Sequence, residues 1–79
     1  MDTKELQDKY PVEPPYEWHT SSAFFTGIVN PHTTKHWYGW YRNRSAGWYD
    51  EKGGLSNVDV SSEEEGLALI YARFLLGMN

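Results

Sequence analysis

The chain has 79 residues, a net charge of −4 and no cysteine. This length forms one small domain, and the lack of cysteine excludes disulfides, thiolate chemistry and zinc sites that need sulfur ligands. No run approaches the ~20 apolar residues of a membrane-spanning helix, and the polar start at Met1–Glu5 does not resemble a secretory signal, so we expect a cytoplasmic protein with no membrane partner.

Charge is sorted into blocks along the chain. Residues 1–17 have a net charge of −3, residues 18–49 have +3 with no acidic residue, and residues 50–65 have −5. The middle block also contains most of the Trp, Tyr and Phe residues. A basic, aromatic segment therefore lies between two acidic ones.

Residues 1–17 are predicted to be an irregular acidic arm preceding a single domain at residues 18–79. Three prolines in the arm remove backbone donors and favour extended conformations. At most one helical turn is expected, near residues 3–9, with aromatic residues such as Tyr10 giving partial anchoring.

A short strand is predicted at residues 23–29, which are rich in β-branched and aromatic side chains. Gly27 within it marks a bulge or the close approach of another backbone. A second strand, residues 36–44, is predicted to form a hairpin with Trp48 and Tyr49 through a turn at residues 45–47.

Strand alternation divides residues 36–44 between two faces. The expected core-facing set is Trp37, Gly39, Tyr41 and Asn43. The expected solvent-facing set is His36, Tyr38, Trp40, Arg42 and Arg44.

A further strand at residues 55–60 and a helix at Ser62–Gly77 complete the predicted fold. Ser61 or Ser62 is a suitable N-cap, and three glutamates in the first turn fit a capping box and the positive end of the helix dipole. The predicted buried stripe is Leu67, Ile70, Tyr71, Phe74, Leu75 and Met78. We therefore expect an α+β fold, a small antiparallel sheet of three or four strands in the order ββ(β)βα with one C-terminal helix on one face.

The back of this helix is also apolar, through Leu69, Ala72 and Leu76. A single exposed leucine is ordinary, but two on one line predict a contact with a second copy or another partner. A homodimer is one reading of this line.

Catalytic and metal-binding motifs are weak. The pair His32 and His36 has a helical metal-ligand spacing, but Pro31 and the strand prediction for His36 spoil that geometry, so we expect no metal and no cofactor. No serine has the context of a nucleophile elbow. We therefore expect that the chain is not an enzyme.

The aromatic residues outnumber what a core of this size can enclose, so several must be partly exposed. Exposed Trp, Tyr and Arg dominate binding hot spots, and acidic blocks can imitate a phosphate run against a basic groove. We expect a small inhibitor of the phage or mobile-element kind, similar to anti-CRISPR proteins, that occludes a site on a host protein or ribonucleoprotein. The predicted partner-binding residues are Tyr38, Trp40, Arg42, Arg44, Trp48, Asp50, Glu51, Asp59, Glu63, Glu64 and Glu65.

Residues 36–77, with Trp/Arg-rich strands followed by a helix that begins near Val60-Ser61-Ser62-Glu63, resemble two families: plant ethylene-response DNA-binding domains and the arm-binding domains of phage integrases. The resemblance implies that the sheet lies in the major groove of DNA, with Trp40, Arg42, Arg44 and Trp48 in contact with it. Those domains are basic, whereas this chain is acidic. Nucleic-acid binding is therefore the alternative function.

Overall fold

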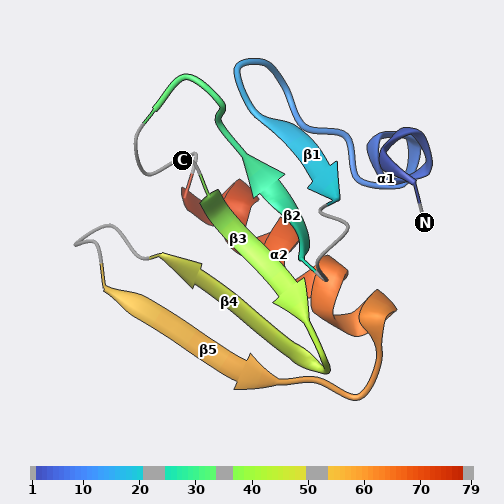
Figure 1. The fold of residues 1–79 in the computed structure, drawn as a ribbon, viewed down its shortest axis with the longest axis vertical. Coiled ribbons are helices and arrows are strands. Elements are labelled where there is room, and N and C mark those ends of the chain that lie inside the picture. Colours follow the sequence, from blue (N-terminus) through green and yellow to red (C-terminus); the bar gives the residue numbers. More distant parts are fainter. Residues whose placement is uncertain (1, 21–24, 34–36, 50–53, 78–79) are drawn as a thin grey trace.

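The computed structural model describes residues 2–20, 25–33, 37–49 and 54–77 of the chain (Figure 1). Two helices flank five strands in the sequence. In chain order the elements are α1 (Thr3–Lys9), β1 (Glu17–Thr20), β2 (Thr26–Val29), β3 (Trp37–Arg42), β4 (Ser45–Tyr49), β5 (Leu55–Asp59) and α2 (Glu63–Gly77). No helix within these ranges is long and apolar enough to cross a membrane.

The strands form one antiparallel sheet in which each strand pairs with the next in the sequence, in the order β1-β2-β3-β4-β5. The predicted α+β class, with a C-terminal helix on an antiparallel sheet, is confirmed. The sheet has one strand more than the upper expectation. The additional strand is β1, whose four residues follow the prolines of the N-terminal segment and carry too short a pattern to be recognised.

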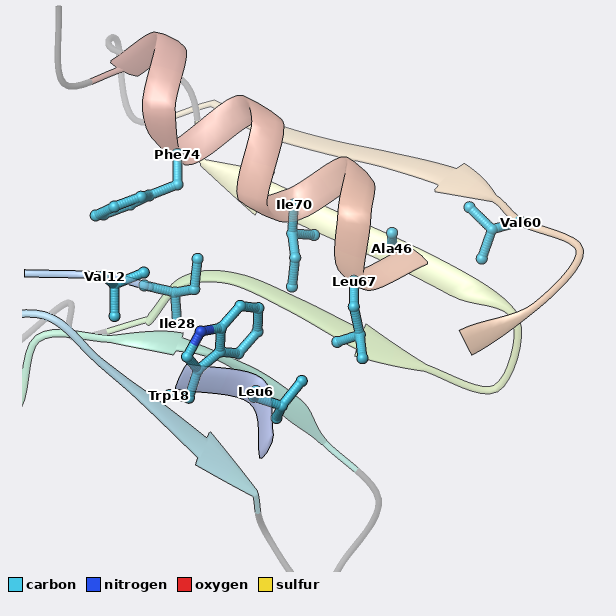
Figure 2. Packing of buried hydrophobic residues seen from close by; sticks show 9 residues of the cluster. All are labelled: Leu6, Val12, Trp18, Ile28, Ala46, Val60, Leu67, Ile70 and Phe74. Atoms are coloured by element: carbon cyan, nitrogen blue, oxygen red, sulfur yellow. The ribbon is translucent and has the colours of Figure 1, made fainter. Parts of the chain in front are cut away.

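Helix α2 covers one face of the sheet, over β3 and β4 (Figure 1). Its residues Leu67, Ile70 and Phe74 are buried, as predicted, and project towards the sheet (Figure 2). The rest of the core comes from all parts of the chain and consists of Leu6, Val12, Trp18, Ile28, Ala46 and Val60.

The predicted helical stripe is too wide. Leu75 is 46 % exposed, which contradicts the prediction that it is buried. At about 100° per residue, Leu75 lies further round the helix than Tyr71, beyond the flank that faces the N-terminal segment. Met78, also assigned to the stripe, lies outside the described residues.

The N-terminal segment is more ordered than the irregular arm that we expected. Asp2 caps α1 by accepting a hydrogen bond from the Glu5 backbone N–H (2.9 Å), and Leu6 is fully buried in the core. The indole Nε1 of Trp18 donates to the Tyr10 carbonyl (2.7 Å). The expected helical turn near residues 3–9 is thus a seven-residue helix. A single buried leucine gives no visible periodicity, so its full length depends on tertiary contacts.

The hairpin turn between β3 and β4 lies two residues earlier than predicted. Asn43 and Arg44 have φ of 46° and 61°, the left-handed values of a two-residue type I′ turn. The predicted turn residues, 45–47, instead belong to β4 and pair with β3. The I′ turn matches the twist of the two strands, and the Arg44 N–H donates to the Tyr41 hydroxyl (3.2 Å).

A bulge between β2 and β3 changes the predicted faces. Ile28 pairs with Gly39 but Val29 pairs with Trp37, so Tyr38 is an extra residue in β3. The prediction holds for Gly39 and Tyr41, which face α2.

The bulge reverses the prediction for Trp37 and Tyr38. Tyr38 lies on the helix side, where its hydroxyl donates to the Arg73 carbonyl (2.8 Å) and its ring meets Phe74 edge-on. Trp37 lies on the other side of the sheet, against Phe25. A one-residue irregularity shifts the alternation, because neighbouring residues in a strand point to opposite faces.

We predict that Phe74→Ala lowers the free energy of unfolding by roughly 3–5 kcal/mol, because it removes a buried ring that Tyr16 and Tyr38 contact. Urea denaturation followed by circular dichroism measures this loss. Leu75→Ala, at the exposed neighbouring position, is the matched control, for which a change within about 0.5 kcal/mol is expected. Equal losses in the two variants would contradict the burial of this helix face.

Candidate functional site

The face of the sheet opposite α2 is covered by neither helix within the described residues (Figure 1). We call it the open face. Strand pairing places one row of residues across its middle, from β1 to β5: His19, Gly27, Trp40, Gly47 and Asn57. The residues that pair directly with Trp40 on β2 and β4 are glycines, so no side chain lies beside it in this row on the two neighbouring strands.

Four aromatic side chains gather on the open face. Phe25, Trp37, Trp40 and Tyr49 line a hollow of about 220 Å³, which we call the aromatic hollow. The rings of Trp40 and Tyr49 are 5.5 Å apart between centroids, and those of Phe25 and Trp37 are 6.0 Å apart. Both pairs are tilted, so the rings form walls rather than one flat stack.

Gly47 creates the space that the Trp40 ring occupies. A Cβ at Gly47 would lie 2.9 Å from Cε2 of Trp40, so the indole lies across β4 towards Tyr49. Gly27 confirms the predicted close approach, because a Cβ there would lie 2.8 Å from the Trp40 Cα. Gly47 is therefore required by the Trp40 ring, whereas Gly27 is required by the β3 backbone, of which the Gly39 carbonyl oxygen would be the nearest atom to a Cβ.

The rim of the hollow is polar. The guanidinium carbon of Arg42 lies 5.1 Å from the centre of the Phe25 ring, a cation–π contact. His19 meets Trp37 edge-on, with ring centroids 5.8 Å apart. Among the described residues, the open face thus combines an apolar centre with the Arg42 guanidinium and the His19 imidazole at its margin.

The structure divides the predicted aromatic and basic site residues between two faces. Trp40 and Arg42 lie on the open face, and Arg44 lies in the adjoining turn. Tyr38 and Trp48 lie on the helix side. Trp48 is only 8 % exposed, and the Arg73 guanidinium covers its ring at 4.9 Å, so it offers little area to a partner.

The predicted acidic residues do not form one patch. Asp50 and Glu51 lie outside the described residues. Asp59 is exposed on β5, in register with Ser45 on the open face. The remaining three, Glu63, Glu64 and Glu65, are exposed in the first turn of α2.

Two of the three helical glutamates maintain local structure. Glu64 pairs with Lys9 of α1 at 3.1 Å, an exposed ion pair that adds little stability. Glu65 accepts hydrogen bonds from the hydroxyl and the backbone N–H of Ser61, and these lower the pKa of Glu65 below its ordinary value of 4.5. Its own N–H donates to the Ser62 hydroxyl (3.1 Å), which confirms the predicted N-cap.

The predicted oligomer contact is partly used within the chain. Leu69 is half-buried and packs against the core, whereas Ala72 and Leu76 are exposed, Leu76 at 65 %. The exposed apolar surface of α2 is therefore centred on Leu75 and Leu76 rather than on the predicted line.

Sequence reasoning missed Phe25, Trp37, Tyr49 and His19 as parts of the site. Trp37 was assigned to the core because the bulge that reverses it leaves no mark in the strand pattern. The face of Tyr49 could have been predicted from the sequence. Residues two apart in a strand point to the same face, and Tyr49 lies two residues after Gly47.

Nowhere in the described ranges do His, Asp and Glu side chains form a group of three that could hold a metal ion. His36, one half of the weak histidine motif, lies outside those ranges. Comparison with family models, with curated proteins and with solved structures finds no match for this chain.

We predict that Glu65 contributes a pH-dependent part of the stability. Because its folded-state pKa is lowered, its contribution is present above pH 4.5 and is lost as the pH falls through the folded-state pKa. Denaturation from pH 7 to pH 2 should therefore show Glu65→Gln less stable than the wild type at neutral pH, with the difference disappearing in acid. Ser61→Ala is the control, because it removes the hydroxyl donor and should raise the pKa of Glu65 in an NMR titration. Parallel pH profiles for Glu65→Gln and wild type would contradict the assignment.

We predict that Gly47→Ala displaces the Trp40 ring, because the new Cβ would lie within 2.9 Å of the indole. The measurement is the set of NMR cross-peaks between the Trp40 and Tyr49 rings, which should weaken or vanish. Asn57→Ala, on the strand next to Gly47 and in the same row, is the control and should leave the cross-peaks in place. Unchanged cross-peaks in Gly47→Ala would mean that the indole does not lie over β4.

Proposed function

We propose that this chain is a non-enzymatic binding protein that occludes a site on a protein partner with the open face of its sheet. The observation that carries the proposal is the aromatic hollow, in which Trp37, Trp40, Tyr49 and Phe25 stay partly exposed on a face that neither helix covers. In a chain of this size, rings placed outside the core cost solubility unless they serve a contact.

The composition of the open face favours a protein partner. Trp, Tyr and Arg are the residues most enriched in binding hot spots, and Trp40, Tyr49 and Arg42 lie together there. The hollow is also smaller than the roughly 300–1,000 Å³ typical of pockets for whole small molecules. A volume of about 220 Å³ suits a single side chain of a partner, inserted between the rings as an anchor.

Charge supports the same choice. The open face carries Arg42 and His19 but also Asp59, and the chain as a whole has a net charge of −4. A nucleic acid would meet repulsion from the acidic residues unless they pointed away from it. Inhibition by occlusion, with the acidic residues steering a basic partner surface, is consistent with this balance.

Nucleic-acid binding is the second candidate. It is favoured by one observation, that Trp40 and Arg42 face the same side of the sheet, as the resemblance to the DNA-binding families implies. Base stacking on Trp40 with a phosphate contact from Arg42 would use this pair. If the chain binds nucleic acid in this way, its affinity for the nucleic acid must fall steeply as the salt concentration rises.

We predict that Trp40→Ala weakens the complex with a protein partner by about 2 kcal/mol or more, about 30-fold in Kd, because truncating a central anchor empties the hollow. The partner is first captured from cells of the source organism and identified by mass spectrometry. The purified pair is then measured by calorimetry. Leu75→Ala, an exposed apolar position on the opposite side of the molecule, is the matched control and should bind like the wild type.

Two results would contradict the proposal. One is equal affinity of Trp40→Ala and Leu75→Ala for the purified partner, which would take the open face out of the contact. The other is submicromolar binding of the wild type to duplex or single-stranded DNA at physiological salt, lost in Arg42→Glu, which would establish the second candidate instead.

A further inference from the structure

Strand β5 is a free edge of the sheet. The strand order ends with β1 on one side and β5 on the other, and α1 packs beside β1 (Figure 1). None of the described elements lies beyond β5. Natural edge strands are usually protected by lysine, proline or a bulge, but β5 has the sequence Leu55-Ser56-Asn57-Val58-Asp59 and pairs with β4 without irregularity.

The pairing with β4 determines which backbone groups face outwards. The Val60 N–H donates to the Arg44 carbonyl (2.8 Å), and hydrogen-bonded pairs alternate along an antiparallel ladder. Ser56 and Val58 therefore bond to β4, whereas the N–H and C=O groups of Leu55, Asn57 and Asp59 point to the free edge. This is the arrangement to which an extended peptide adds as a further strand.

Charge decides between the possible occupants. The only charged residue of β5 is Asp59, and residues 54–65 contain no Lys or Arg. A second copy that paired edge to edge would bring two strands together that each carry an acidic residue and no basic one, and like charges at close range are unfavourable. A basic strand would instead bring a charge of the opposite sign close to Asp59, which favours its binding at this edge.

We infer that the free edge of β5 accepts an extended basic segment of a protein partner as a sixth strand of the sheet. This inference rests on the proposed function in assuming a protein partner, but it uses backbone groups and a surface other than the aromatic hollow. Residues of the added strand would alternate between the two faces of the sheet.

The neighbouring side chains specify the segment further. On the open face, Leu55 is 59 % exposed and lies in register with Tyr49, while Asp59 lies at the other end of the strand. On the helix side, Val58 is 40 % exposed. The fitting segment therefore carries Lys or Arg on the open face, near Asp59, and apolar residues on the helix side, against Val58, so that the two kinds alternate along it. The aliphatic part of a Lys side chain covers Leu55.

The test uses the full chain, labelled with ¹⁵N, and a seven-residue peptide of alternating Lys and Val with blocked ends as the probe. We expect saturable binding and at least tenfold slower hydrogen exchange at the amides of Leu55, Asn57 and Asp59. The amides of Ser56 and Val58, already bonded to β4, should change much less. The same peptide with Glu in place of Lys should give no protection.

A matched pair of variants isolates the backbone contribution. Asn57→Pro removes one edge-facing N–H, at a position where an edge strand tolerates proline, and should weaken peptide binding at least tenfold. Asn57→Ala keeps the N–H and should bind like the wild type. If Asn57→Pro does not fold, the exchange pattern of the wild type still decides the question.

The inference is overturned if the basic peptide leaves the exchange of Leu55, Asn57 and Asp59 unchanged at millimolar concentration. It is also overturned if these amides are protected without peptide, in proportion to protein concentration and with a dimer mass in sedimentation, because the occupant is then a second copy. Neither result bears on Trp40, whose contribution to partner binding is measured separately, so the edge can fail while the proposed function stands.

Discussion

The structure depends on the packing of one amphipathic helix against one face of a five-stranded sheet. Leu67, Ile70 and Phe74 of α2 form the helix side of the core. They pack in one cluster with side chains of the sheet such as Ile28 and Ala46 (Figure 2). With α1 placed beside β1, neither helix of the described residues covers the other face. A small domain that buries one face well must leave the other exposed, and the residues on that second face are then free to serve binding.

What the open face presents follows from small irregularities of the backbone. The bulge at Tyr38 turns that ring onto the helix and brings Trp37 to the open face. The glycines at positions 27 and 47 make room around Trp40. The bulge interrupts the regular pairing of β2 with β3, and through it Trp37 joins Phe25, Trp40 and Tyr49 around one hollow.

The acidic residues have different surroundings in the structure, and therefore different roles. Glu64 pairs with Lys9 of α1 and Glu65 accepts hydrogen bonds from Ser61, so both make contacts within the chain. Asp59 lies on the free edge strand, next to backbone groups that have no partner within the sheet. Asp59 therefore belongs more to the β5 edge than to the aromatic hollow, and the two surfaces meet where Tyr49 and Leu55 are in register.

The sequence by itself determined the α+β class, the position of β5, and α2 with its serine cap, because these depend on periodicity and capping within one segment. It also identified Trp40 and Arg42 as outward residues, since simple alternation holds between them. Tertiary structure alone decided the rest. The helix at Thr3–Lys9 is stabilised by the burial of Leu6, and the faces of Trp37 and Tyr38 are set by pairing with β2, contacts between residues far apart in the chain that no local pattern records.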